Sequence, residues 1–217
     1  TFYGNLSGAV GYWDHVHAGH YDWQRNGKTL REDGYVTDLQ ASEALRVVRG
    51  RDKTRPLFMF LSLLAPHLPN EAPPQAIDAY ADSTDERRRV QAAMVSELDA
   101  AVGQLLAVLD EEGMSDNTLV WFMSDNGGLT QYRGMPDGFY RILNGAKWLW
   151  GDDIPIRFIE FMRTNAEDGG ADSTPLKGAK ASVKEGGIRV PGIVRWPGNF
   201  AEGKFATRIS VLDMLPT

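Results

Sequence analysis

The segment that most constrains the fold reads Leu57-Phe58-Met59-Phe60-Leu61-Ser62-Leu63-Leu64, a continuous apolar run of strand length. A second run, Leu119-Val120-Trp121-Phe122-Met123, lies further along the chain. Such runs are typical of strands buried on both faces, as in a parallel sheet that is covered by helices. Each run follows a segment with helical periodicity. The order helix, strand, helix, strand predicts a layered α/β domain.

The two predicted helices are marked by signals at their ends. Thr37, followed three residues later by Gln40, matches a capping box, and Gly50 ends this first helix. The Ser-Thr-Asp run at 83–85 can cap the second helix, which extends to Gly113. Its apolar residues recur every three or four positions, so they share one face.

Composition excludes several classes of protein. The 217 residues include 23 Lys and Arg against 29 Asp and Glu, with a net charge of -6 and no Cys. The acidic balance argues against a nucleic-acid partner, and the run Arg87-Arg88-Arg89 among acidic residues is interpreted as a solvated helix face. The lack of Cys excludes disulfides, thiolate zinc sites and cysteine nucleophiles. We expect no membrane span, because the longest apolar run, 57–65, is far shorter than the roughly 20 residues required.

Candidate functional residues follow the two apolar runs, where functional side chains gather in α/β sheets. Asp125 and Asn126 offer the hard oxygen ligands that Ca²⁺ or Mg²⁺ prefers, although Asp-Asn-Gly-Gly is also the composition of a simple turn. His67, in Ala65-Pro66-His67-Leu68-Pro69, is either a structural or a catalytic histidine. Lys180 is either a solvated lysine or a point charge for an anionic substrate.

Three other features are interpreted as structural. His15, His17 and His20 do not match a recognised metal-ligand spacing. No strand leads into the carboxylate pair Asp152-Asp153. The segment Ser173-Thr174-Pro175-Leu176-Lys177 approaches a Ser-x-Pro-x-Arg nucleophile motif, but its last position is Lys.

Taken in order, these elements resemble the type I sulfatase family of the alkaline-phosphatase-like superfamily. The segments that carry the resemblance are Phe2-Tyr3-Gly4, the stretch from Asp22-Trp23 to Thr37-Asp38, Ala65-Pro66-His67-Leu68-Pro69, Ser124-Asp125-Asn126-Gly127-Gly128, Lys180 and Glu185-Gly186-Gly187-Ile188-Arg189-Val190-Pro191. The resemblance covers nearly the whole chain. It implies an alkaline-phosphatase-like α/β/α sandwich with a largely parallel sheet, here incomplete, and places residues 1–217 within a single sulfatase catalytic domain.

The resemblance implies a sulfuric ester hydrolase and assigns roles to particular positions. Asp125 and Asn126 resemble two ligands of the family's single divalent cation, Ca²⁺ or Mg²⁺, and Asp125 would also help to deprotonate the nucleophile. His67 and Lys180 resemble the pair that grips the sulfate ester and stabilises the leaving oxygen. The family nucleophile is a formylglycine hydrate, made from the first residue of a Cys/Ser-x-Pro-x-Arg motif.

Three parts of the family pattern are missing from these residues: the nucleophile motif, a strand-end Asp-Asp pair and a Gly-Lys-Trp-His segment. In the family all three precede the point where this chain begins, so we interpret the chain as an internal piece that needs an N-terminal part of the same domain. Alone, it should be inactive and should expose an apolar sheet edge. Gly178-Ala179-Lys180 stands where Gly-Gly-Lys is common. The long separation of Asn126 from Lys180 predicts an insertion at about 129–173.

The implied substrate is a sulfated small molecule or a sulfated glycan, and a periplasmic or secreted location is suggested by the resemblance alone. Two alternatives remain open. One is a phosphonate monoester or phosphodiester hydrolase of the same superfamily, which uses similar metal and anion ligands. The other is a non-catalytic anion-binding module, which a nucleophile motif upstream of residue 1 would argue against.

Overall fold

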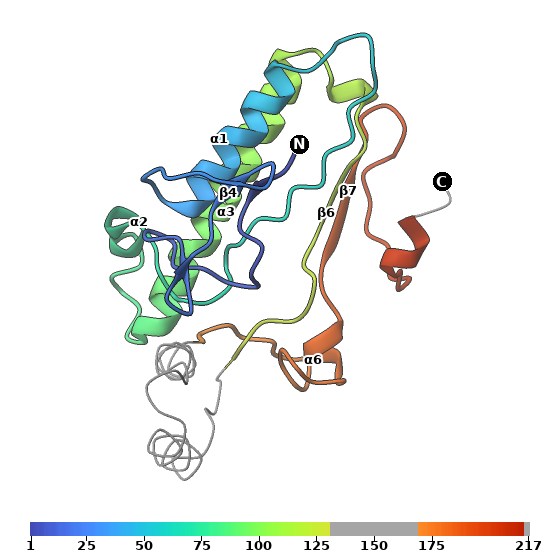
Figure 1. The fold of residues 1–217 in the computed structure, drawn as a ribbon. Helices are drawn as coiled ribbons and strands as arrows, with labels where there is room; N and C mark the ends of the chain where they lie inside the picture. Colours follow the sequence, from blue (N-terminus) through green and yellow to red (C-terminus); the bar gives the residue numbers. More distant parts are fainter. Residues whose placement is uncertain (131–168, 215–217) are drawn as a thin grey trace.

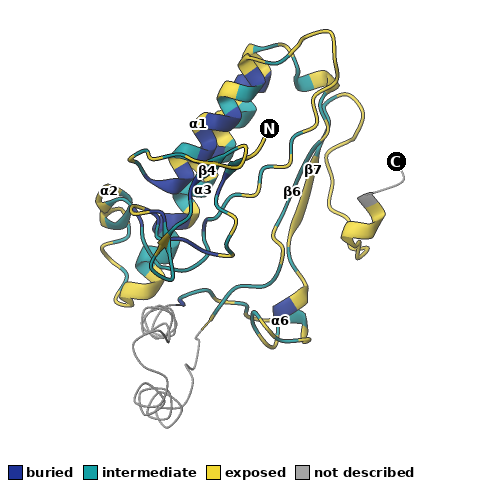
Figure 2. Ribbon diagram, in the orientation of Figure 1, coloured by how far each residue is buried: buried dark blue, intermediate teal, exposed yellow. Residues whose placement is uncertain are grey.

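Two long helices packed along each other dominate the computed structural model, which describes residues 1–130 and 169–214 (Figure 1). They are α1 (Val36–Arg49) and α3 (Glu86–Glu111). Figure 2 shows that the buried residues of both helices lie mainly where the two helices face each other and the N-terminal region. Both helices are therefore confirmed as core elements.

The helix ends agree only in part with the sequence signals. The Asp85 side chain accepts hydrogen bonds from the second and third backbone N–H groups of α3, so this predicted cap is confirmed. Gly50 ends α1, as predicted. The capping box is wrong, because α1 begins after Tyr35, without a side-chain cap, and Thr37 and Gln40 are buried inside the helix. Tertiary packing has placed these polar side chains against the core instead.

A buried cluster joins the helices to the extended part of the molecule. Its members are Val48, Val108 and Leu109. Met59, from the segment 57–64, and Val120, from β6 (Val120–Met123), both pack against it. The segment 57–64 and β6 thus lie on the same helical layer, which is the arrangement expected of a sheet covered by helices.

The strand predicted at 57–64 is not assigned as a strand. The segment is extended, but within residues 1–130 and 169–214 no strand pairs with it. Its side chains alternate, with Phe58 90% and Phe60 84% exposed while Met59 and Leu61 are half-buried. A segment is assigned as a strand only when it is hydrogen-bonded to a neighbouring strand. Residues 57–64 have the extended conformation of a strand but lack such a neighbour among the described residues.

Strand β6 forms as predicted and pairs antiparallel with β7 (Gly192–Arg195), with Val120 opposite Arg195. Pro191 lies directly before β7, consistent with its expected interruption of that run.

The first 30 residues are an irregular region, as predicted, with two-residue strands β1 (Tyr3–Gly4), β2 (Val16–His17), β3 (His20–Tyr21), β4 (Gln24–Arg25) and β5 (Lys28–Thr29). All described pairs are antiparallel, so the parallel pairing of the prediction is not represented among them.

A second buried cluster joins this N-terminal region to both helices and to the loop that carries His67. It comprises Val10, Tyr12, Trp23, Tyr35, Val36, Ala65, Ala72, Ala93 and Met94. The remaining described elements are short: α2 (Pro74–Asp78), α6 (Glu185–Ile188) and the 3₁₀ turns Ser115–Asn117 and Val211–Met214. The core of the described chain therefore lies on the side of the molecule that supports the His67 loop.

Helix α3 is, by length and composition, also apolar enough to cross a membrane. Its buried residues pack against α1, which is how a core helix is used, and the expectation of no membrane span stays a prediction. The insertion expected at about 129–173 falls mostly on 131–168, which lie outside the described residues together with Asp152-Asp153.

Candidate active site

His67 lies in the loop that follows the extended segment, and its backbone is fixed on both sides. Its N–H donates to the Leu64 carbonyl at 2.9 Å, and its carbonyl accepts from the Tyr12 hydroxyl at 2.8 Å. Ring atom Nδ1 lies 2.9 Å from the Leu68 carbonyl oxygen. Because a carbonyl only accepts, Nδ1 carries a proton, and Nε2 is the basic nitrogen of the neutral ring. The loop thus fixes both the position and the tautomer of His67.

Asp125 and Asn126 begin the turn directly after β6. Asp125 is exposed and Asn126 is half-buried, and the Ser124 hydroxyl donates to the Asn126 carbonyl at 2.8 Å. The turn follows a strand whose four residues all pair with β7, from Val120 opposite Arg195 to Met123 opposite Gly192. The Asp125 carboxylate is consequently presented at the surface from a well-anchored backbone.

The turn interlocks with the segment that carries Lys180. Gly127 N–H donates to the Gly187 carbonyl at 2.9 Å, and Lys180 N–H donates to the Gly128 carbonyl at 2.9 Å. A Cβ on Gly127 would lie 2.8 Å from the carbonyl carbon of Gly186 and closer still to its oxygen. Only glycine permits this approach of two backbones. Glycines at 127, 186 and 187 therefore bring Lys180 to the Asp125 turn.

The charges of these segments meet at His67. Burial lowers the pKa of the His67 imidazole, and the Lys180 cation lowers it further. The Leu68 hydrogen bond and the Asp125 carboxylate act in the opposite direction, and the net pKa lies below its ordinary value. Lys180 and Asp125, which are far from His67 in the sequence, thus act on its pKa in opposite directions, and the expected joint role of the three residues stays a prediction.

This arrangement is suited to binding an anion. Burial and the Lys180 ammonium lower the pKa of the His67 imidazole, so the ring is largely neutral at pH 7. A dianionic or monoanionic ester placed between them would favour the protonated imidazole, because opposite charge raises the pKa of a histidine. The group could then both hold an anion and supply a proton to it.

The residues present fit a divalent cation as part of a ligand set. Asp125 and Asn126 offer carboxylate and amide oxygens, the hard donors that Ca²⁺ and Mg²⁺ prefer. Ca²⁺ takes about six to eight oxygens, and within the described residues no group of three or more His, Cys, Asp or Glu side chains could hold a metal. The expected metal roles of Asp125 and Asn126 stay predictions that need further ligands.

The N-terminal histidines include one with a clear structural position. His15 is buried, with Nε2 3.0 Å from the Gly34 carbonyl oxygen and its ring stacked on Trp23 at 4.9 Å. Its packing among aromatic rings and its bond to a backbone carbonyl account for it without a metal. The interpretation of His15 as structural is consistent with this position.

Three residues that position the site were not identified from the sequence. The Gln40 side chain donates to the Ser62 carbonyl at 3.2 Å and accepts from Leu64 N–H at 3.0 Å, which fixes the segment leading into His67. Tyr12 holds the His67 carbonyl, and Asn70 donates to the Gly169 carbonyl at 2.7 Å. The one available signal was Gln40 itself, a polar residue on the apolar face of the first predicted helix.

Comparison with known proteins identifies the family. The Sulfatase family model matches residues 2–217. Steryl-sulfatase of Rattus norvegicus is 32% identical over 188 residues, which cover 84% of this chain and 26% of that protein. Arylsulfatase J of Mus musculus is 27% identical, with 91% of this chain and 28% of that protein covered. The chain thus spans about a quarter of the length of these relatives.

A solved structure agrees at the level of the fold. The crystal structure of Ps i-CgsB in complex with k-i-k-neocarrahexaose has a TM-score of 0.67 and 28% identity, and covers 90% of this chain and 39% of that one. The predicted fold class, an incomplete alkaline-phosphatase-like α/β domain, is confirmed. From the family model and these likenesses together, we conclude that the chain belongs to the sulfatase family.

Proposed function

We propose that the protein is a sulfuric ester hydrolase and that these residues form part of its active site. The observation that supports the proposal is the backbone bonding of the Lys180 segment to the Asp125 turn, from Lys180 N–H to the Gly128 carbonyl and from Gly127 N–H to the Gly187 carbonyl, together with the opposite effects of the two charges on the pKa of His67. Family membership supports the same conclusion. A cation can stabilise the charge of an anionic ester, a titratable group can donate a proton to its leaving oxygen, and a carboxylate can accept one from a nucleophile.

In this proposal Lys180 and His67 hold the sulfate ester. The ammonium neutralises charge on the sulfate oxygens, and the bound anion raises the pKa of His67, so that the imidazolium can donate a proton to the leaving oxygen. The Nδ1 bond to Leu68 orients the ring, leaving Nε2 as the donor in the protonated form. Both groups stabilise charge that develops in the transition state.

Asp125 and Asn126 would hold the divalent cation, Ca²⁺ or Mg²⁺, with ligands from outside these residues. The cation would supply positive charge for the sulfate and for the nucleophile. The nucleophile itself, a formylglycine, would come from a Cys/Ser-x-Pro-x-Arg motif elsewhere in the protein, since none of the 217 residues belongs to such a motif. Asp125 would then accept a proton from it.

The substrate would be a sulfated small molecule or a sulfated glycan. The relatives' names point to aryl and steryl sulfates, whereas the structurally similar Ps i-CgsB was crystallised with an oligosaccharide. The sulfate ester common to this class would contact His67 and Lys180. The alcohol would lie beyond them, against other parts of the surface.

The test is turnover of para-nitrophenyl sulfate, with phenylphosphonate monoester as the competing substrate, by the full-length protein in Ca²⁺. Lys180→Ala should lower kcat/KM for the sulfate roughly a hundredfold, since one lost transition-state donor costs this much. Lys204→Ala is the matched control, because Lys204 is exposed in the described C-terminal segment. Near-unaltered activity of Lys180→Ala, or preference for the phosphonate, would overturn the proposal.

The metal assignment has its own measurement. Asp125→Ala combined with Asn126→Ala in the full-length protein should abolish Ca²⁺ binding measured by calorimetry. Asp213→Ala, which removes an exposed carboxylate in the C-terminal 3₁₀ turn, is the control and should leave affinity unchanged. Undiminished affinity of the double variant would remove Asp125 and Asn126 from the site.

A further inference from the structure

One buried side chain of α1 holds the backbone that leads into His67. Gln40 is 7% exposed, its Nε2 donates to the Ser62 carbonyl at 3.2 Å, and its Oε1 accepts from Leu64 N–H at 3.0 Å. In an extended segment the backbone groups of residues two positions apart face the same side, where one residue of a parallel neighbouring strand would make this pair of bonds. The Gln40 amide therefore takes the place of a strand neighbour, beside a segment that has none among the described residues.

Leu64 is the single residue that connects Gln40 to His67. Its N–H donates to Gln40, and its carbonyl accepts from His67 N–H at 2.9 Å. The imidazole is in turn fixed to the adjoining backbone, because Nδ1 donates to the Leu68 carbonyl. A shift of Leu64 would therefore change the position of the His67 backbone and, with it, of the ring.

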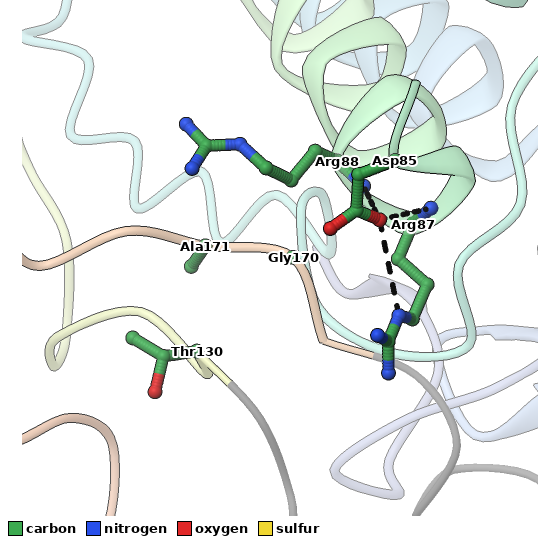
Figure 3. Close-up of a pocket in the computed structure, with 6 residues that line it drawn as sticks. All are labelled: Asp85, Arg87, Arg88, Thr130, Gly170 and Ala171. Atoms are coloured by element: carbon green, nitrogen blue, oxygen red, sulfur yellow. Dashed lines mark hydrogen bonds and ion pairs between the residues drawn. The ribbon is translucent and has the colours of Figure 1, made fainter. Parts of the chain in front are cut away.

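The loop that carries the histidine is held at its other end by separate contacts. The Asn70 side chain donates to the Gly169 carbonyl at 2.7 Å. Gly170 follows with a φ of +112°, and a Cβ there would lie 2.8 Å from the Arg87 carbonyl carbon in the first turn of α3. Figure 3 shows Gly170 in the chain that passes the start of this helix. Loss of the Gln40 bonds should thus release the beginning of the loop while its end stays in place.

We propose that Gln40 is a positioning residue for His67: its amide fixes Leu64, and the Leu64 carbonyl fixes the backbone of the histidine. A purely structural glutamine would contribute to stability alone, whereas a positioning residue also determines the surroundings of the imidazole. The inference rests on the proposed function for its effect on the rate. Its effect on the His67 ring does not depend on that function.

The test is Gln40→Met in the full-length protein. Methionine keeps the length and the apolar stem of glutamine but has no amide, so neither bond can form. We expect kcat/KM for para-nitrophenyl sulfate to fall about tenfold or more, because a small misplacement of a reacting group is costly in rate. Burial is the largest cause of the lowered His67 pKa, so a released segment should raise that pKa in a ¹⁵N NMR titration. An unchanged His67 pKa in the variant overturns the proposal.

Glu43→Gln is the matched control for a general loss of stability. Glu43 lies on the same helix one turn after Gln40, and its carboxylate accepts from Arg25 and Arg46 and not from the segment that leads into His67. This variant should have a lower free energy of unfolding but the kcat/KM and the His67 pKa of the unaltered protein. Equal changes of both quantities in Glu43→Gln and Gln40→Met would overturn the positioning role.

Hydrogen exchange in the unaltered protein tests the contact without any variant. Leu64 N–H should exchange far more slowly than the amide of an exposed loop, because its bond to Gln40 must open first. Rapid exchange at Leu64 overturns the proposal even if Gln40→Met does not fold. If the unaltered protein hydrolyses no sulfate ester, the proposed function fails, and the exchange of Leu64 and the His67 pKa still decide the role of Gln40.

Discussion

Gly127→Ala is the most direct test of how the site is assembled. The added Cβ would come 2.8 Å from the Gly186 carbonyl carbon and closer still to its oxygen, whereas ordinary contact begins at 3.4 Å. The turn and the 185–187 backbone must then separate by on the order of 1 Å, and a misplacement of about 1 Å can cost a hundredfold in rate. We expect kcat/KM for an aryl sulfate to fall by about that factor in the full-length protein.

The matched control is Gly103→Ala. Gly103 is exposed on α3, and nothing lies within 4 Å of the position that the added methyl group would take, so alanine should raise stability by about 0.5–1 kcal/mol and leave activity unchanged. Gly127 does not have a left-handed φ, so an effect there comes from crowding and not from backbone strain. The reasoning would be refuted if Gly127→Ala kept the kcat/KM of the unaltered protein and if adding Lys180→Ala lowered that value by the usual factor. The close approach of the two backbones would then not be what positions Lys180.

The remaining predictions concern charge. Hydrogen bonds from Arg46 and Arg25 lower the pKa of Glu43 to about 2. The ionised Glu43 carboxylate therefore contributes roughly 3 kcal/mol to the free energy of unfolding above pH 4.5, and this contribution is lost as the pH falls towards 2. Urea unfolding of Glu43→Gln should therefore give a lower free energy of unfolding at pH 7 and a smaller decrease of that free energy between pH 4.5 and pH 2. A decrease equal to that of the unaltered protein would contradict this. The pKa of His67, measured by ¹⁵N NMR titration of the imidazole, should be higher in Lys180→Ala, because the positive charge of Lys180 lowers that pKa in the unaltered protein. An unchanged pKa would mean that Lys180 lies far from the ring.

The helices were predictable because their signals are local. The cap at Asp85 and the stop at Gly50 lie within a few residues of the ends they determine, and both are confirmed. Strand β6 was predictable for a related reason, since its apolar run ends in a clear turn. The segment 57–64 has the same composition, but whether it pairs depends on a neighbour elsewhere in the chain, which no local pattern contains.

In the candidate site, too, the residues with a local sequence signal were predictable and the contacts with distant parts of the chain were not. Asp125, His67 and Lys180 could each be identified from the sequence as candidates, and a family resemblance assembled them into a set. The contacts that hold them together involve Gln40 and Asn70, whose roles depend on distant backbone atoms at 62–64 and 169. Residue types such as Gln and Asn carry no specific signal for this role, because the same side chains serve equally well at the surface.

The geometry of the site is set by main-chain contacts more than by its functional side chains. Lys180 reaches the Asp125 turn because Gly128 accepts its N–H, and His67 keeps its tautomer because Leu68 accepts its Nδ1 proton. Main-chain contacts of this kind persist when neighbouring side chains vary, but they fail when a Cβ enters a glycine position. Further main-chain bonds join the chain after this turn to residues 170–171, from Ala171 N–H to the Leu129 carbonyl at 3.2 Å and from Gly170 N–H to the Thr130 carbonyl at 3.4 Å. A displacement of the Asp125 turn must therefore also move residues 170–171, because main-chain bonds connect the two segments.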